Sequence, residues 1–504
     1  MRPIESTYAE LVSTLKELKC LQSIGSVMGW DERVMLPDRG TAYRAEQNAL
    51  LARLCHEKFT SPRVGEMLTE LAGSDLVKNP DSDAAVNVRE ARRTYDRQTK
   101  LPASLVVELS KTEVLAQQAW ADARKNNTYK TFSPWLEKTL HLLQQSADCI
   151  GYTTTRYDAL LDGFEPGETS ANLRNVFESL RAPLVELVGK IGASGRPAPL
   201  DILERAYPVD AQQRVAREVA TCVGFDFSAG RLDVSVHPFS SGIAPGDTRI
   251  TTRYDPHYFS DAFFGTLHEC GHALYSQGLP TDHFGTPRGD DVSLGIHESQ
   301  SRLWENLVGR SRSFWTFFLP RVRAEFPEAL KDVSDDDWYR AVNDVRPSLI
   351  RTESDEATYN LHVLLRFELE QALLAGDLSV NDLPGAWNES MRKYLHVTPP
   401  DDARGCLQDI HWSGGAIGYF PTYTLGNLYA AQLFRQARAD LGDLDAQFSQ
   451  GHFNPLLQWL RKNIHTHGMT YTAPQLVQRI TGKPLSAEPL LTHLKQKARE
   501  VYGV

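Results

Sequence analysis

Apolar residues recur along most of this chain at intervals of three and four positions, which is the spacing of one helical face. In residues 7–29, for example, Leu11, Leu15 and Leu18 lie on one face of the expected helix. The same spacing predicts further helices at residues 41–56, 82–99, 102–127, 133–149, 170–192 and 210–223. The first half of the chain is therefore predicted to be almost entirely helical.

Residues 231–237 and 248–254 alternate apolar and polar side chains, which is the period of a β-strand. The residues between them are rich in turn formers, so the two strands predict a small β-hairpin. Helical spacing then resumes and continues almost to the end of the chain, with loops expected at 278–292 and 414–426. The expected fold class is mostly α, with one small β-sheet.

The helix predicted just after the hairpin carries the pattern His-Glu-x-x-His at residues 268–272. His268 and His272 are four residues apart, so they share a helix face and can bind one metal ion. Glu269 lies beside the metal without being a ligand, which suits a general base for a metal-bound water. Two ordinary surface histidines are the alternative. The apolar neighbours disfavour it, because a buried histidine pair without a partner is costly.

A catalytic zinc usually has three protein ligands and an open position. Glu298 lies 26 residues beyond His272, on a helix that Ser293 can cap, so it can return to the metal. Alternatively, Glu298 only complements the helix dipole, as acidic residues in first turns often do. His297 is another candidate ligand. Neighbouring helix residues point about 100° apart, so we expect only one of the two to bind.

Length and composition limit the class of protein. A chain of 504 residues can bury a large core, and its length allows several domains or one large body. With 54 basic and 64 acidic residues the net charge is −10, which disfavours nonspecific binding to nucleic acid or to an anionic membrane. Six scattered cysteines, no apolar leader and no apolar run of membrane-spanning length indicate a cytoplasmic protein. Cys270, inside the metal motif, is expected only to fill space.

The metal motif is one of a series of short motifs. In order, the chain contains Gly29-Trp30-Asp31, His237-Pro238-Phe239, Asp247-Thr248-Arg249-Ile250-Thr251, His268-Glu269-Cys270-Gly271-His272, His297-Glu298-Ser299-Gln300, Ile350-Arg351-Thr352-Glu353-Ser354-Asp355-Glu356, Gly405-Cys406-Leu407-Gln408-Asp409-Ile410-His411-Trp412 and Gly418-Tyr419-Phe420-Pro421-Thr422-Tyr423-Thr424-Leu425-Gly426-Asn427. Together they make the chain resemble the carboxypeptidase Taq family of thermostable metallocarboxypeptidases. The resemblance covers nearly the whole sequence.

The resemblance implies a mostly helical, two-lobed peptidase with a deep substrate groove and a small β-sheet beside the active site, similar to neurolysin and angiotensin-converting enzyme. Residues 1–504 would form a single metallocarboxypeptidase domain. Within it we expect a helical scaffold at about 1–223, the hairpin and catalytic part at about 224–430, and C-terminal helices at about 431–504.

The resemblance also implies the reaction. The enzyme would remove single C-terminal residues from peptides with broad specificity, would use one divalent metal per chain (zinc, or cobalt) and would form a homodimer. The metal ligands carried over are His268, His272 and Glu298, and the general base is Glu269.

A carboxypeptidase must also bind the free carboxylate of its substrate, and a bidentate arginine does this best. Arg351, which has acidic neighbours that could orient it, is our candidate. Its alternative is a structural salt bridge with Glu353 or Asp355. Asp247 and Arg249, beside the predicted hairpin, are expected to be structural.

The charge that develops on the scissile carbonyl oxygen needs a hydrogen-bond donor. Tyr423, expected on a glycine-flanked loop, resembles the tyrosine that serves related peptidases, and Tyr419 is held in reserve. His411 either hydrogen-bonds the substrate or packs beside Trp412. His237 is a further candidate for contact with the substrate.

Three alternatives remain open from the sequence. An oligoendopeptidase on the same fold would carry the same zinc signature. A peptide-binding protein with an inactive site is disfavoured by the complete set of ligands and base. A purely structural zinc site usually has four cysteine or histidine ligands, so it fits this motif poorly.

Overall fold

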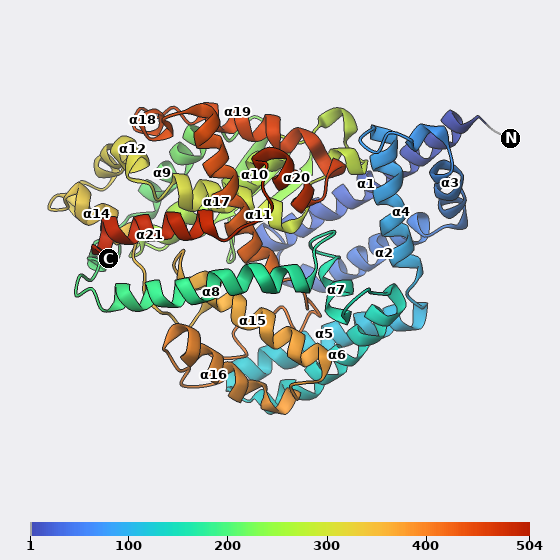
Figure 1. Cartoon of the computed structure of the whole chain (residues 1–504), viewed down its shortest axis with the longest axis horizontal. Coiled ribbons are helices and arrows are strands. Elements are labelled where there is room, and N and C mark those ends of the chain that lie inside the picture. Colours follow the sequence, from blue (N-terminus) through green and yellow to red (C-terminus); the bar gives the residue numbers. More distant parts are fainter. Residues whose placement is uncertain (1–2) are drawn as a thin grey trace.

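The computed structural model describes residues 3–504 and shows a mostly helical protein with one small sheet, as the sequence predicts (Figure 1). The helices of the first half are α1 Ile4–Val34, α2 Thr41–Phe59, α3 Pro62–Ala72, α4 Asp83–Thr99, α5 Ala103–Asn126, α6 Tyr129–Ile150, α7 Arg156–Leu161, α8 Ser170–Gly192 and α9 Val209–Val223. Those of the second half are α10 Phe259–Ser276, α11 Leu294–Arg302, α12 Arg312–Glu325, α13 Pro327–Leu330, α14 Asp335–Val342, α15 Thr358–Ala375, α16 Leu383–Leu395, α17 Pro421–Leu441, α18 Leu444–Phe448, α19 Asn454–Asn463, α20 Ala473–Thr481 and α21 Glu488–Tyr502.

The sheet differs from the predicted hairpin. It has three strands, β1 Gly230–Val234, β2 Ser240–Ala244 and β3 Asp247–Thr252, in the order β1-β3-β2. The two strands predicted from the alternating pattern are β1 and β3, and they pair in parallel. The hairpin instead joins β3 to β2, within the stretch expected to be only a turn. Ser240, Ser241 and Gly242 have little preference for strands, which hid β2 from the pattern.

Most of the apolar side chains belong to one large core that runs from α5 to α21, whereas α1, α3 and α4 share a smaller cluster. The helix α8 crosses the middle of the view in Figure 1, with α15 and α16 on one side and α21 on the other. Helix α2 packs on α1 and buries none of its own side chains. Within residues 3–504 none of the helices combines the length and hydropathy that a membrane crossing needs.

Two glycines set the distance between the helices at the centre of the fold. A Cβ atom on Gly271 of α10 would lie 2.4 Å from the Cα atom of Ser301 on α11. A Cβ atom on Gly426 of α17 would lie 2.4 Å from Cγ of Glu298, also on α11. Because only glycine leaves room for such approaches, α10 and α17 both pack directly against α11.

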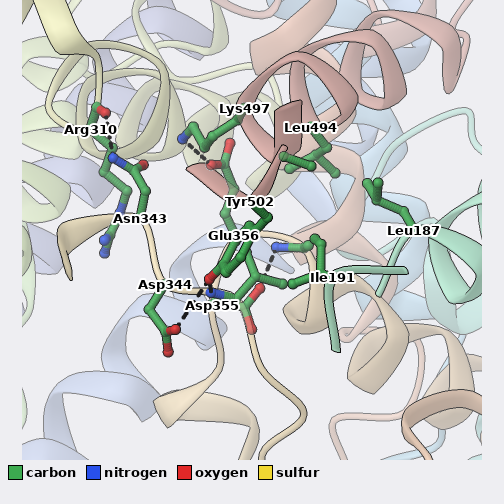
Figure 2. A pocket seen from close by; sticks show the side chains of 13 residues that line it. Leu187, Ile191, Arg310, Asn343, Asp344, Asp355, Glu356, Leu494, Lys497 and Tyr502 are labelled. Atoms are coloured by element: carbon green, nitrogen blue, oxygen red, sulfur yellow. Dashed lines mark hydrogen bonds and ion pairs between the residues drawn. The ribbon is translucent and has the colours of Figure 1, made fainter. Parts of the chain in front are cut away.

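A small cavity of about 20 Å³ lies between α8, α21 and residues 343–357, and it has room for one water molecule (Figure 2). Lys497 of α21 reaches into it and bonds Glu356 at 2.5 Å, and His493 binds the other oxygen of the same carboxylate at 2.8 Å. These contacts fasten the C-terminal helix to the segment that carries Arg351. None of the predicted metal ligands lines this cavity.

Candidate active site

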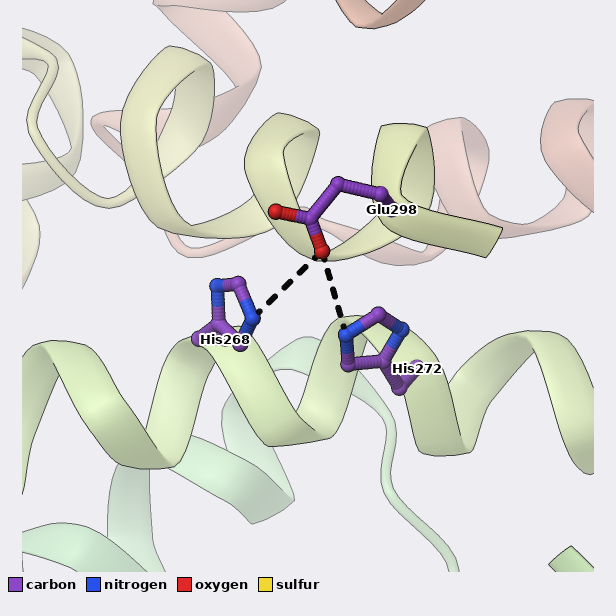
Figure 3. Close-up of side chains that lie close together, drawn as sticks. All are labelled: His268, His272 and Glu298. Atoms are coloured by element: carbon purple, nitrogen blue, oxygen red, sulfur yellow. Dashed lines mark ion pairs between the residues drawn. The ribbon is translucent and has the colours of Figure 1, made fainter. Parts of the chain in front are cut away.

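The structure brings His268, His272 and Glu298 together at the contact between α10 and α11 (Figure 3). Glu298 Oε2 is 3.6 Å from His268 Nε2 and 3.4 Å from His272 Nε2. As predicted, Ser293 caps α11, with its hydroxyl accepting a hydrogen bond from the Ile296 amide. The carboxylate therefore points from one helix onto two imidazoles of the other.

This triad fits a tetrahedral ion. Zinc–ligand bonds of about 2.0–2.1 Å place neighbouring ligand atoms about 3.3 Å apart. The two separations to Glu298 are close to that value, and all three ligand atoms lie within 4.8 Å of one another. A set of two histidines and one glutamate leaves the fourth position for water or substrate, as catalytic zinc sites do.

Each ligand is oriented by a further side chain. Glu305 Oε2 lies 2.9 Å from His268 Nδ1, and His297 Nδ1 lies 2.5 Å from His272 Nδ1. Glu298 accepts a hydrogen bond from Arg302 Nε at 2.7 Å. Such partners fix ring orientation and ligand basicity in metal sites. His297 is thus placed behind His272, and the triad is completed by Glu298.

Burial and charge hold two of the three candidate ligands, Glu298 and His272, in the form that binds a metal. Burial alone would raise the pKa of Glu298, but Arg302 and the two histidines outweigh it and hold that pKa well below its usual range. Burial lowers the pKa of His272 to about 3, so this imidazole is neutral and available as a ligand. Glu269 is buried beside them, and burial raises its pKa to about 7, a suitable value for a group that takes up and releases a proton.

A second polar cluster surrounds Arg351, which is 5% exposed. Its Nε and Nη2 atoms donate to Asp409 Oδ1 at 3.2 and 2.8 Å, and Nη1 donates to Tyr359 Oη at 2.8 Å. Arg366 binds the other oxygen of Asp409 at 2.6 Å. The salt-bridge partner is Asp409, and neither Glu353 nor Asp355, the partners named in the alternative interpretation, takes that place. Two buried arginines share one carboxylate, which leaves the cluster a net positive charge.

The two polar clusters are adjoining. The guanidinium of Arg302, which binds Glu298, lies 4.4 Å from the centroid of the Tyr359 ring. The hydroxyl of that same ring accepts from Arg351. The Tyr359 ring therefore lies between Arg351, the candidate for binding the substrate carboxylate, and Arg302, which binds Glu298.

Tyr423 lies in the first turn of α17 and not on a loop, because Pro421 is a favourable first residue for a helix. His411 Nε2 is 3.3 Å from Tyr423 Oη, and the Arg351 guanidinium is 4.9 Å from the Tyr423 ring centroid. Tyr419 lies edge-on to Tyr423 at 5.4 Å. His411 packs against Phe420 at 4.6 Å, and burial lowers its pKa to about 4. The structure thus groups Arg351, His411, Tyr419 and Tyr423.

Comparisons with known proteins show the family of this chain. Residues 10–498 match the carboxypeptidase Taq (M32) metallopeptidase family. The chain belongs to the carboxypeptidase Taq family. It is 49% identical to thermostable carboxypeptidase 1 of Thermus thermophilus, over 99% of each chain.

Two solved structures show the same fold. The M32 carboxypeptidase from Deinococcus radiodurans R1 superposes with a TM-score of 0.96 at 41% identity, over 99% of this chain and 100% of the other. A carboxypeptidase from Pyrococcus furiosus gives a TM-score of 0.94 at 35% identity, over 97% and 98%. The protein is therefore a metallocarboxypeptidase, a peptide hydrolase that uses a divalent metal.

His237 of this carboxypeptidase is exposed on the segment between β1 and β2, outside both polar clusters. The next residue, Pro238, lies 3.9 Å from the Cβ position of Gly265, one turn ahead of Glu269 on α10. The segment therefore borders the metal helix.

The motif residues Asp247 and Arg249 form a salt bridge on β3, with N–O distances of 2.7 and 2.8 Å. The Arg249 guanidinium lies 4.6 Å from the Trp30 ring, and that of Arg231 lies 4.9 Å from it. These motifs thus fasten the end of α1 to the sheet, in agreement with the structural role expected for Asp247 and Arg249.

Sequence reasoning missed the groups that support the carboxypeptidase site. Glu305 lies seven residues beyond Glu298, so its spacing on one helix face was a usable signal. The chain at Glu305 is a π-helix, Leu303–Val308, a form that often marks functional sites and that no sequence pattern predicted. Asp409 was visible inside a motif, but its partner lies 58 residues away.

Proposed function

We propose that this metallocarboxypeptidase removes single residues from peptide C-termini at the site formed by His268, His272, Glu298 and Glu269. The observation that carries the proposal is the spacing of the three ligand atoms, with a buried carboxylate beside them. Bound there, a divalent ion would supply Lewis acidity and lower the pKa of a water ligand towards 7. Zinc suits two histidines and a carboxylate, and cobalt can take the same ligands.

The side chains supply the remaining chemistry. Glu269 accepts the proton of the attacking water and passes it to the amine that leaves. The Tyr423 hydroxyl donates a hydrogen bond to the carbonyl oxygen as that oxygen gains charge, and His411 orients the hydroxyl. Tyr419 packs against Tyr423 and holds its ring.

Replacement of Glu269 by Gln tests this mechanism. The variant should keep one metal per chain, because Glu269 is not a ligand, yet lose on the order of 10³-fold or more in kcat, because the proton has no acceptor. Glu298→Gln is the matched control and should lose the metal itself. Near-normal turnover of Glu269→Gln with its metal confirmed would refute the role of Glu269.

Action at the C-terminus is supported by the net positive charge beside Tyr423. A free substrate carboxylate would balance the charge left by Arg351 and Arg366 around Asp409. Mass spectrometry of peptide digests, run with zinc and with cobalt, checks the outcome. We expect ladders that lose one C-terminal residue at a time. Internal cuts would indicate an oligoendopeptidase.

We also propose a homodimer that buries an apolar stripe on α2 and α5. Tyr43, Leu50 and Leu54 are exposed on one face of α2, and Val107 and Val114 are exposed seven residues apart on α5. Exposed stripes of this kind mark interaction surfaces. Sedimentation should show a dimer that Leu50→Glu with Leu54→Glu converts to a monomer. Val236→Glu, at an exposed position beyond β1, is the control and should leave the dimer unchanged.

A cytoplasmic location is the remaining part of the proposal. All six cysteines of residues 3–504 are free thiols, which suits a reducing compartment. Cell fractionation with antibodies to the native protein checks the location. Recovery in a secreted fraction would contradict it.

A further inference from the structure

A buried carboxylate far from the metal motif in sequence anchors the helix that carries Glu298. Glu165 follows α7 and has no exposed surface. Its Oε1 atom accepts from the Ser293 hydroxyl at 2.9 Å and from the Tyr429 hydroxyl at 3.1 Å. Its Oε2 atom accepts from the Gly295 amide at 2.9 Å. The carboxyl group of Glu165 thus accepts three hydrogen bonds.

These contacts complete the hydrogen bonding at the start of α11. A helix leaves its first four amides without partners inside the helix. Here the Leu294 amide donates to the Phe164 carbonyl at 3.3 Å and the Gly295 amide donates to Glu165. The Ile296 amide donates to the Ser293 hydroxyl, and the His297 amide makes the first bond within the helix, to the Ser293 carbonyl. Of the three partners of the Leu294, Gly295 and Ile296 amides, two therefore come from the turn after α7.

The same carboxylate also fixes α17. Tyr429 lies on α17 three residues beyond Gly426, the residue that packs against the Glu298 side chain. Gly295 fits between the two anchoring groups, since a Cβ atom there would lie 2.7 Å from Glu165 and 3.0 Å from the Tyr429 ring. Glu165 thus joins the helix of the third metal ligand to the helix of Tyr423.

We propose that Glu165 is a positioning residue of the metal site, which sets the place of Glu298 through the hydrogen bonds to Ser293, Gly295 and Tyr429. The proposal rests on the proposed metal ligands. A carboxyl group suits this place, because its two oxygens accept from three donors. An amide in its place would turn an N–H group toward at least one of those donors.

The test compares metal binding of the whole enzyme with that of Glu165→Gln and Tyr429→Phe. Glu165→Gln should raise the dissociation constant for zinc on the order of tenfold or more, the range seen when the groups that orient metal ligands are changed. It should also alter the visible absorption of the cobalt-loaded protein. Tyr429→Phe removes only the contact between Glu165 and α17. It should change the zinc dissociation constant and the cobalt absorption in the same direction as Glu165→Gln, but by a smaller amount.

Glu168→Gln is the matched control. Glu168 is also a buried glutamate, three residues further on, but it binds the Thr169 amide and the Asn172 side chain at the start of α8. It should lower thermal stability without weakening metal binding. If both Glu165→Gln and Tyr429→Phe keep the zinc affinity and the cobalt spectrum of the wild type, the positioning role of Glu165 is refuted and the proposed metal site is unaffected. Undiminished zinc binding in Glu298→Gln would instead refute the metal site itself.

Discussion

The strongest test of C-terminal action is the replacement of Arg351 by Met. The guanidinium carries five N–H groups, of which three bind Asp409 and Tyr359. Two N–H groups remain for a substrate carboxylate. Loss of a buried, charge-assisted contact of this kind costs about 3–5 kcal/mol. That cost corresponds to roughly 10²–10³-fold or somewhat more in kcat/KM.

Arg351→Met should cost less in free energy of unfolding than in kcat/KM, because Asp409 keeps Arg366 as a partner. Arg366 Nη2 remains 2.6 Å from its second oxygen, so no unpaired buried charge is created. Arg351→Met should therefore stay folded, and the kinetic effect can be measured at full occupancy of the metal.

The assay uses pairs of peptides that differ only in a free or amidated C-terminus. Arg351→Met should lose kcat/KM on the free acids and change little on the amides, since the amides offer no carboxylate. Arg366→Met is the matched control: it removes the same charge from the cluster but keeps the N–H groups of Arg351, so the preference for free acids should fall much less than in Arg351→Met. An equal loss on acids and amides in Arg351→Met would show that Arg351 is structural and would refute the reasoning.

Three further outcomes follow from the packing and charges. Asp409→Asn should lower the free energy of unfolding by about 3–5 kcal/mol in thermal or denaturant melts, because two buried arginines lose the carboxylate that they share; a loss below about 1 kcal/mol would contradict this. Gly271→Ala should weaken zinc binding, because its Cβ would lie 2.4 Å from α11, whereas Gly385→Ala, with open space around it, should not. Burial raises the pKa of Glu370 to about 7, so the native state holds a proton that the unfolded state releases near pH 4.5. Stability should therefore fall by up to about 3 kcal/mol between pH 5 and 8, and Glu370→Gln should flatten this slope in melts across that range.

The grouping of His268, His272 and Glu298 could be predicted because its geometry is mostly local. His268 and His272 lie on one face of a single helix, and the loop before α11 is long enough to return a carboxylate. The sequence could not show how close the helices come, since that depends on which residue types face each other across the contact. Gly271 and Gly426 are small for this reason, and neither lies at a turn.

Pairings between distant segments were the part that local patterns could not give. The alternative interpretation paired Arg351 with its neighbours Glu353 or Asp355, yet Asp409, 58 residues away, takes the contact. The parallel pairing of β1 with β3 was hidden for a related reason. Alternation shows that a segment can be a strand but not which strand lies beside it.

Gly426, one of the glycines that led to the prediction of a loop around Tyr423, connects Tyr423 with the candidate metal ligand Glu298. Gly426 lies three residues beyond Tyr423 on α17 and touches the Glu298 side chain. Tyr423 and Gly426 lie on the same helix. A shift of α17 along α11 would therefore move the Tyr423 hydroxyl relative to the Glu298 carboxylate. The packing of α17 on α11 therefore sets the position of Tyr423. Tyr429, on the next turn of α17, donates a hydrogen bond to Glu165, and this bond opposes a shift of the helix.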